Sequence, residues 1–283
     1  MLPVFLIALT GYLFGKRKKI DLSPINDFVI YLATPALIIS SLSRDTIEIY
    51  LAGKVFISVC IIIGVSMVLC FMVLKALKFP LKVYLPPALF ANTGNMGLPL
   101  ALFAFGKAGF NVAILYIVST TILQYTLGIL ILNYDESPFE IFRLPLVYSA
   151  IAGVLLSVSG WTMPVSVFRA FDLLGEASIP TMIFALGYKL SEVALTDVNR
   201  SFLVGGMRIL LGVMLGMLTV SIFKLDGVAA KVVILQSAMP PAIFNFVLAE
   251  KYNQDSERVA SIILAGTLIS VITTPVIIAF LLD

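Results

Sequence analysis

The sequence predicts an all-α integral membrane protein with ten transmembrane helices, and three observations support this fold class. Of the 283 residues, 60% are hydrophobic and only 12% are charged, whereas about a quarter of the residues in a soluble domain are charged. Apolar stretches long enough to cross a bilayer recur along the whole chain. Two of these stretches contain a proline pair, Pro86-Pro87 in the first half of the chain and Pro240-Pro241 in the second.

The expected helices follow one another with short connections. A helix that crosses the hydrocarbon needs about 20 apolar residues, so the first helix is short. Residues 1–15 are apolar and precede the basic residues 16–19, which is the order of a first membrane helix and not of a secretory signal peptide. The ten helices are expected at residues 2–15, 23–42, 52–74, 83–105, 110–132, 143–160, 163–188, 201–223, 229–249 and 257–281.

The distribution of basic residues predicts that both termini are extracytoplasmic. Cytoplasmic loops carry an excess of Lys and Arg. With the N-terminus outside, twelve of the nineteen Lys and Arg residues lie on the cytoplasmic side, five lie on the opposite side and two fall inside spans. The cluster at residues 16–19 weighs most, because it directly follows the first helix.

The two halves of the chain are expected to be related repeats. Each half has five expected helices, so the second half enters the membrane from the opposite side and the repeat is inverted. This predicts a first repeat at 1–133, a short linker at 134–142 and a second repeat at 143–283. The alternative is that short apolar strings match by chance. At a constant offset of 147 residues, Phe105-Gly106, Val112-Ala113, Thr120 and Ile122 correspond to Tyr252-Asn253, Val259-Ala260, Thr267 and Ile269.

The fourth and ninth expected helices are predicted to be discontinuous and to cross. Proline removes a backbone donor and clashes with the preceding turn, and freed backbone groups cannot be left facing hydrocarbon. Two interruptions at matching places in the two halves therefore predict a polar site inside the membrane. This pattern is typical of the substrate site of a secondary transporter.

The first interruption offers a site for an anion. Asn92 and Asn95 share a helix face if this turn is helical, Thr93 lies between them, and Pro99 suits the start of the second half-helix. A half-helix N-terminus presents free N–H groups and the positive end of its dipole, which favour a carboxylate. The two asparagines either bind the substrate directly or only cap the interrupted backbone.

The second interruption and a neighbouring helix complete the candidate substrate site. Gln236, Pro240 and Pro241 belong to this interruption, and Asn245 is the expected partner of the first asparagine pair. Here too, capping is the alternative. Gln124 in the fifth expected helix is costly to bury in lipid, so we expect it to be functional. The Ser and Thr residues of the nearby helices are expected mainly to hold helices together.

Charged residues inside the spans are candidates for ion coupling. Asp172 and Glu176 lie on one face near the start of the seventh expected helix, together with Arg169. Glu176 is the deepest acid in this prediction, and burial would favour its protonated form, so it is the candidate proton carrier. An ion pair between Arg208 and Glu176 or Asp172 is the alternative.

The composition also excludes several classes of function. Histidine is absent, which removes the commonest metal ligand and general base. Cys60 and Cys70 indicate neither a disulfide framework nor a metal site. The net charge of +3 is too small to indicate a nucleic-acid partner. We therefore expect no enzyme activity, no nucleic-acid partner and no cofactor, with Na⁺ or H⁺ as a possible coupling ion.

Two motifs of the sequence resemble those of the auxin efflux carrier family. Residues 92–99, Asn-Thr-Gly-Asn-Met-Gly-Leu-Pro, followed by Phe105-Gly106, resemble the motif of the family's fourth helix. Residues 240–253 resemble the motif of its ninth helix, with Asn245 where the plant pattern commonly has proline. The plant proteins' long cytoplasmic loop is absent, so the sequence is similar to prokaryotic members.

The resemblance implies a fold shared with sodium/bile-acid symporters, in which a transport part moves against a scaffold like an elevator. It implies an organic anion as substrate, with Asn92, Pro99 and Asn245 at the family's substrate positions. No indole pocket can be recognised, so auxin is not the expected substrate. We expect a carboxylate transporter that lies in the lipid bilayer of the plasma membrane. A homodimer is the candidate assembly. The alternatives are a sodium-coupled symporter of a bile-acid-like anion and a ligand-sensing module that does not transport.

Overall fold

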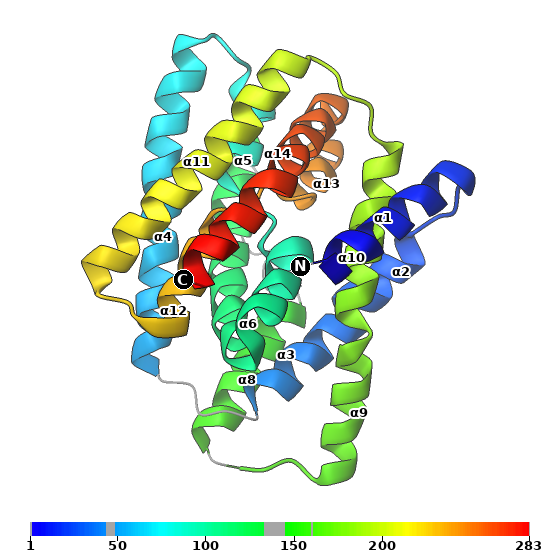
Figure 1. Cartoon of the computed structure of the whole chain (residues 1–283), viewed down its shortest axis with the longest axis vertical. Helices are drawn as coiled ribbons and strands as arrows, with labels where there is room; N and C mark the ends of the chain where they lie inside the picture. The colour runs from blue at the N-terminus through cyan, green and yellow to red at the C-terminus, as the bar shows by residue number, and fades with distance from the viewer. Residues whose placement is uncertain (1, 44–48, 133–144, 160, 283) are drawn as a thin grey trace.

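The computed structural model describes residues 2–43, 49–132, 145–159 and 161–282. The predicted linker at 134–142 lies outside these residues. Within the described ranges the regular secondary structure is helical, with no β-strand and only one isolated bridge, between Ala91 and Pro241. The prediction of an all-α fold is therefore confirmed (Figure 1).

In the first half, the helices are connected by short turns or merge into one another. Three π-helical segments, η1, η2 and η3, continue directly into α-helices. The elements are α1 (Leu2–Arg17), α2 (Ser23–Phe28), η1 (Val29–Ala33), α3 (Thr34–Leu42), α4 (Ile49–Ala76), α5 (Leu81–Leu89), η2 (Thr93–Gly97), α6 (Leu98–Leu123), η3 (Gln124–Gly128) and α7 (Ile129–Leu132).

In the second half, a single residue, Ala177, separates α9 from α10. Connections of three to six residues join the helices from α10 to α14. The elements are α8 (Pro145–Ser159), α9 (Val165–Glu176), α10 (Ser178–Glu192), α11 (Val198–Phe223), α12 (Gly227–Ser237), α13 (Phe244–Lys251) and α14 (Ser256–Leu282).

Six helical stretches of the described chain are long and apolar enough to cross a membrane, and several expected spans do not reach this length. At 1.5 Å per residue, α1 with 16 residues and α8 with 15 are shorter than a full crossing, and α12 has only 11 residues because it ends at the second interruption. The protein is thus a multi-pass membrane protein, and the count of ten spans stays a prediction. The six stretches are Ser23–Leu42, Tyr50–Ala76, Thr93–Leu132, Val165–Glu192, Val198–Phe223 and Ser256–Leu282.

The stretch Thr93–Leu132 is not one straight helix, because Gly106 turns the chain inside α6. Its φ of 66° and ψ of −160° lie in a region that only glycine adopts readily. The predicted boundary between the fourth and fifth helices, between residues 105 and 110, falls at this turn.

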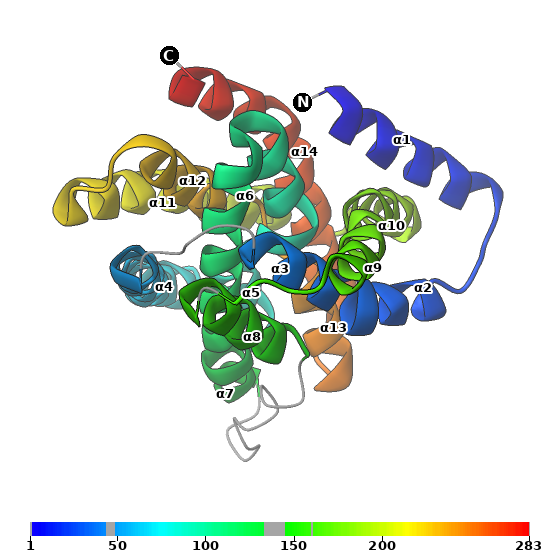
Figure 2. The same cartoon turned by 90° about the horizontal axis from the view of Figure 1, so that it is seen from below.

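The helices form two groups that pack extensively within themselves and only sparsely against each other. The first group contains α1, α2, η1, α3, α8, α9 and α10, and the second contains α4, α5, η2, α6, η3, α7, α11, α12, α13 and α14. Figure 2 shows α1, α2, α9 and α10 on one side of the molecule and α4, α11 and α12 on the other. The few contacts between the groups include those of α10 with η2 and of α3 and α8 with α6.

The second group holds the largest part of the core, and α5 and α6 run through it. Tyr84, Phe90, Leu98 and Leu100 are among the largest fully buried side chains, and all of them lie in α5, in α6 or between the two. The chain between α5 and α6 is therefore enclosed by packed helices and does not face lipid, as the polar composition of residues 92–97 requires.

Candidate functional site

The two interruptions meet and are joined by backbone hydrogen bonds. The Asn92 N–H donates to the Pro240 carbonyl at 2.7 Å, and the Ala242 N–H donates to the Phe90 carbonyl at 2.9 Å. Between these two bonds, Ala91 lies opposite Pro241 in an antiparallel bridge. The bridge requires no N–H from either proline, so proline at 240 and 241 costs no hydrogen bond here.

The first proline pair does not lie at the interruption. Pro86 and Pro87 belong to α5, and the chain becomes extended only at Phe90, with φ −96° and ψ 116°. The interruption therefore follows the proline pair and leads directly into the segment from Asn92 to Pro99, where the first site was predicted. On the other side, Pro240 and Pro241 lie within the non-helical segment between α12 and α13.

Two amide side chains form a chain of hydrogen bonds that ends at the Phe90 carbonyl, directly after α5. The Asn245 Nδ2 donates to the Phe90 carbonyl at 3.2 Å, and the Gln124 Nε2 donates to the Asn245 Oδ1 at 3.2 Å. Asn245 is 1% exposed and Gln124 is 7% exposed, so the amide chain is shielded from solvent. Two roles were considered for Asn245, direct substrate contact and capping of the interrupted backbone. Its hydrogen bond to Phe90 gives it the capping position.

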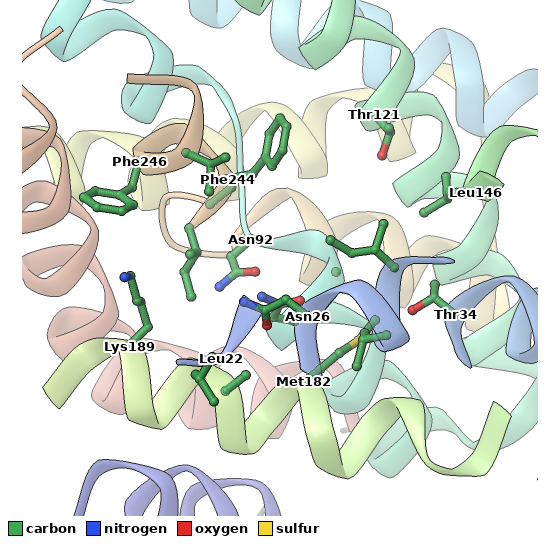
Figure 3. A pocket seen from close by; sticks show the side chains of 18 of the residues that line it. Leu22, Asn26, Thr34, Asn92, Thr121, Leu146, Met182, Lys189, Phe244 and Phe246 are labelled. Carbon is green, nitrogen blue, oxygen red and sulfur yellow. The ribbon is translucent and has the colours of Figure 1, made fainter. Parts of the chain in front are cut away.

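A cavity of about 460 Å³ lies beside the crossing, between the two groups of helices. This volume lies in the range of small-molecule sites. Its walls are mainly apolar, from residues such as Ile117, Met182 and Phe244. Polar groups gather where Asn92, Thr93, Gly94 and Asn95 form the start of η2. Figure 3 shows Asn92 of this segment together with Asn26 and Lys189, which also line the cavity.

The start of η2 supplies the donors for an anion. The first N–H groups of a helix have no partner within the helix, and Gly94 and Asn95, at these positions, line the cavity. The Asn92 carbonyl accepts a hydrogen bond from the Gly97 N–H at 3.0 Å, which closes the first π-helical turn. Asn92 lines the cavity, and its Nδ2 is buried without a hydrogen-bond partner within the described part of the chain.

The structure brings four of the nine predicted substrate residues to the cavity. Asn92, Thr93, Asn95 and Gln124 line it. The other five lie behind its wall and are buried: Pro99, Gln236, Pro240, Pro241 and Asn245. Gln236 is fully buried against Gly97, and neither of its amide atoms has a hydrogen-bond partner among the described residues.

The two acids that we considered for ion coupling do not line the cavity. Glu176, at the end of α9, is exposed, and Asp172 is half-buried. The interior ion pair with Arg208 is not formed; the Arg208 Nη2 donates instead to the Ser237 carbonyl at 2.9 Å. Both acids therefore lie apart from the groups that line the crossing.

Several cavity residues were missed by sequence reasoning. Asn26 follows the Ser23-Pro24 start of α2, where it was indistinguishable from a helix-start residue. Lys189 and Glu192 lie in the last turn of α10, and Glu250 lies in the last turn of α13. Lys189 is one of the twelve basic residues that the charge distribution placed on the cytoplasmic side, and only the folded arrangement places it in the cavity wall.

One acid of the cavity wall lies outside the membrane helices and is held ionised. The Asp21 carboxylate accepts hydrogen bonds from the Ser23 hydroxyl at 2.6 Å and from the Ser23 N–H at 2.9 Å. These bonds, the side-chain one first, lower the pKa of Asp21 below its ordinary value. Asp21 therefore contributes a negative charge to the wall at neutral pH.

Taken together, the fold and the cavity define a multi-pass membrane protein with a cavity of small-molecule size between two groups of helices. A family model described as "Membrane transport protein" matches residues 1–142 and 135–278. The chain belongs to this family, which includes the auxin efflux carriers, and it is a membrane transporter and not an enzyme.

Individual relatives cover different shares of the chain. An uncharacterised transporter of Methanocaldococcus jannaschii is 25% identical over 291 residues, which cover 96% of this chain and 94% of the relative. A candidate malonate transporter of Rhizobium meliloti is 25% identical over 305 residues, which cover 96% and 92%. Auxin efflux carrier component 8 of Arabidopsis thaliana is 26% identical over 137 residues, which cover 46% and 37%.

Proposed function

We propose that this protein is a secondary transporter of a small organic anion and that the anion binds where the two interrupted helices cross. The observation that carries this proposal is the start of η2. Gly94 and Asn95 of its first turn line an otherwise largely apolar cavity, and the Asn92 Nδ2 beside them is buried without a hydrogen-bond partner among the described residues. A carboxylate there would accept hydrogen bonds from these donors and would lie at the positive end of the helix dipole.

The wider architecture in this proposal is a ten-span protein built from two inverted repeats, 1–133 and 143–283, that are joined by the linker 134–142. Both termini are extracytoplasmic and the membrane is the plasma membrane. The broken helices with their paired interruptions support this arrangement, because inverted-repeat transporters bind substrate at such crossings.

The transport step in this proposal is a movement of one helix group against the other. Extensive packing within each group and sparse contact between them support such a movement, because sparse interfaces allow relative motion of domains. The cavity lies between the groups, with Asn92 on one side and Met182 on the other. A gradient of Na⁺ or H⁺ drives the step, and two copies of the chain assemble as a homodimer.

The relative from Rhizobium meliloti suggests malonate as the first substrate to test. The protein would be reconstituted into liposomes, and uptake of radiolabelled malonate would be measured with a Na⁺ gradient, with a pH gradient and with neither. We expect uptake that depends on one of the two gradients. Binding of malonate without uptake under all three conditions would contradict transport and favour a sensing module.

The role of the crossing would be tested with Asn92→Ala in the same assay. We expect uptake to fall by about tenfold or more, because a buried donor to a charged group is lost. Asn199→Ala is the matched control, since Asn199 is an exposed asparagine at the start of α11. Equal uptake by the two variants, at equal amounts of inserted protein, would contradict the assigned role of Asn92.

A further inference from the structure

The cavity carries a cation whose neighbours indicate a second anchor for the transported anion. Resting on the proposed function above, we propose that Lys189 binds a second negatively charged group of the substrate, so that the site selects dianionic carboxylates over monocarboxylates. In this proposal one carboxylate lies at the start of η2 and the other contacts the Lys189 Nζ.

Lys189 stands out in the distribution of charge around the cavity. Four charged side chains line it: Asp21, Lys189, Glu192 and Glu250. Lys189 is thus the only cation among the described residues of the wall. The three carboxylates repel an anionic group that approaches this part of the wall, so such a group can be accommodated only if Lys189 neutralises it.

The present partner of Lys189 is easily exchanged. Its Nζ lies 3.0 Å from the Glu192 Oε2, and both side chains are 38% exposed. An ion pair of this exposure contributes at most about 1 kcal/mol to stability. A substrate carboxylate held at its other end by η2 can therefore replace Glu192 with little loss of interaction energy.

An aromatic ring from the other helix group positions Lys189 independently of Glu192. The Nζ lies 4.9 Å from the ring centroid of Phe246, a residue of α13. A lysine over an aromatic face is attracted to it by the charge distribution of the ring. The Lys189 ammonium group therefore stays at the cavity wall when its ion pair with Glu192 breaks. It is thus preorganised to bind an anionic group.

Lys189 and the η2 start enter the cavity from different helix groups. Figure 3 shows the side chain of Lys189, on α10, near Phe246, and that of Asn92, next to η2, farther along the same cavity. A substrate with two charged ends connects the groups, whereas a monocarboxylate leaves its apolar end beside Lys189. The apolar end gains nothing from the cation, and this difference is the basis of selection.

Succinate and butyrate form a suitable pair of probes, because both have four carbons and only succinate has a second carboxylate. Binding to the full-length protein in detergent would be measured at pH 7.5 by calorimetry, for the parent, Lys189→Gln and Lys189→Arg. We expect Lys189→Gln to weaken succinate binding by about tenfold to a hundredfold and to leave butyrate binding within about twofold. Lys189→Arg keeps the charge and should retain most of the succinate affinity.

Two further variants make the test specific. Lys54→Gln is the matched control, since the Lys54 Nζ also lies over an aromatic ring, that of Tyr50 at 4.6 Å, but not at the cavity. It should change neither affinity. Glu192→Gln removes the competing carboxylate and should raise the succinate affinity severalfold. This variant also keeps the proposal testable if Lys189→Gln fails to fold, because lower succinate affinity in Glu192→Gln contradicts the exchange.

The outcomes separate this inference from the function on which it rests. If the parent binds neither succinate nor butyrate nor malonate, the proposed anion site is wrong. If the parent binds succinate but Lys189→Gln changes succinate and butyrate affinities equally, or changes neither, the anion site stands and the assignment of Lys189 is overturned.

Discussion

The guanidinium of Arg208 holds the end of a broken helix, because its Nη2 donates to the Ser237 carbonyl at 2.9 Å. Ser237 is the last residue of α12, whose final carbonyls lack partners within the helix. Arg208 is 2% exposed, and it is the only charged side chain buried among the residues that the structure describes. The second interruption thus depends on a cation where the first depends on the amide of Asn245.

Removing this cation should destabilise the protein. Arg208→Ala leaves the Ser237 carbonyl buried without a donor and opens a cavity in the core of the second helix group, so we expect a loss of about 2–4 kcal/mol. Arg208→Gln should lose less, because its amide can still donate a hydrogen bond. Thermal unfolding of the purified variants in detergent measures both. An Arg208→Ala protein as stable as the parent would show that the bond to Ser237 is dispensable.

Close packing of α11 against the end of α12 leads to a second prediction. A Cβ at Gly212 would collide with the backbone carbonyl of Ser237. Gly212→Ala must therefore push the two helices apart, and we expect a loss of about 1–3 kcal/mol. Gly64→Ala in α4 is the control, since no atom lies within 4 Å of its added Cβ, and it should be neutral or stabilising. Equal melting temperatures for the two variants would be incompatible with this contact.

The interruptions could be predicted from the sequence because their cause is local. Proline, glycine and asparagine are poor helix formers, and a polar run such as residues 92–97 is not tolerated against lipid. The proline pair precedes the first interruption, because α5 continues through Pro86 and Pro87 to Leu89. Both prolines lie inside α5, so a proline pair alone does not determine where a helix ends.

The cavity residues outside the interruptions could not be predicted, because they meet only through tertiary packing. Asn26 and Lys189 are separated from Asn92 by long stretches of sequence, and neither belongs to a motif. Glu176, in contrast, was predicted to be buried and is not. Its place within a span suggested burial, but the structure leaves it exposed on α9, since hydropathy does not specify which face of a helix meets its neighbours.

The turn at Gly106 gives a third prediction. With φ of 66° and ψ of −160°, this residue has a conformation that costs other residues about 1–3 kcal/mol. No atom lies within 4 Å of a Cβ added at Gly106, so any loss in Gly106→Ala comes from the backbone and not from a collision. Gly53→Ala, which also has free space but lies inside the regular helix α4, should not lose stability. A stable Gly106→Ala protein would mean that the chain does not turn there.

The amide chain from Gln124 through Asn245 to the Phe90 carbonyl gives the fourth prediction. Both bonds are 3.2 Å long and lie in the buried interior, so each amide is oriented by the other. In a double-mutant cycle with Gln124→Ala and Asn245→Ala, we expect the two losses of stability to be coupled by about 0.5–1.5 kcal/mol. Unfolding by denaturing detergent in mixed micelles measures the four proteins.

The control for this cycle is a polar residue one turn or less from Gln124 that does not touch Asn245. The Thr126 hydroxyl donates to the Ile122 carbonyl at 2.7 Å within its own helix, so Thr126→Ala and Asn245→Ala should be additive within about 0.5 kcal/mol. Additivity of the Gln124 pair as well would mean that Asn245 caps α5 without help. Coupling in the Gln124 pair alone would show that Gln124 and Asn245 act as one unit. Such a unit connects the fifth expected helix to both interruptions, so three segments far apart in sequence together stabilise the crossing.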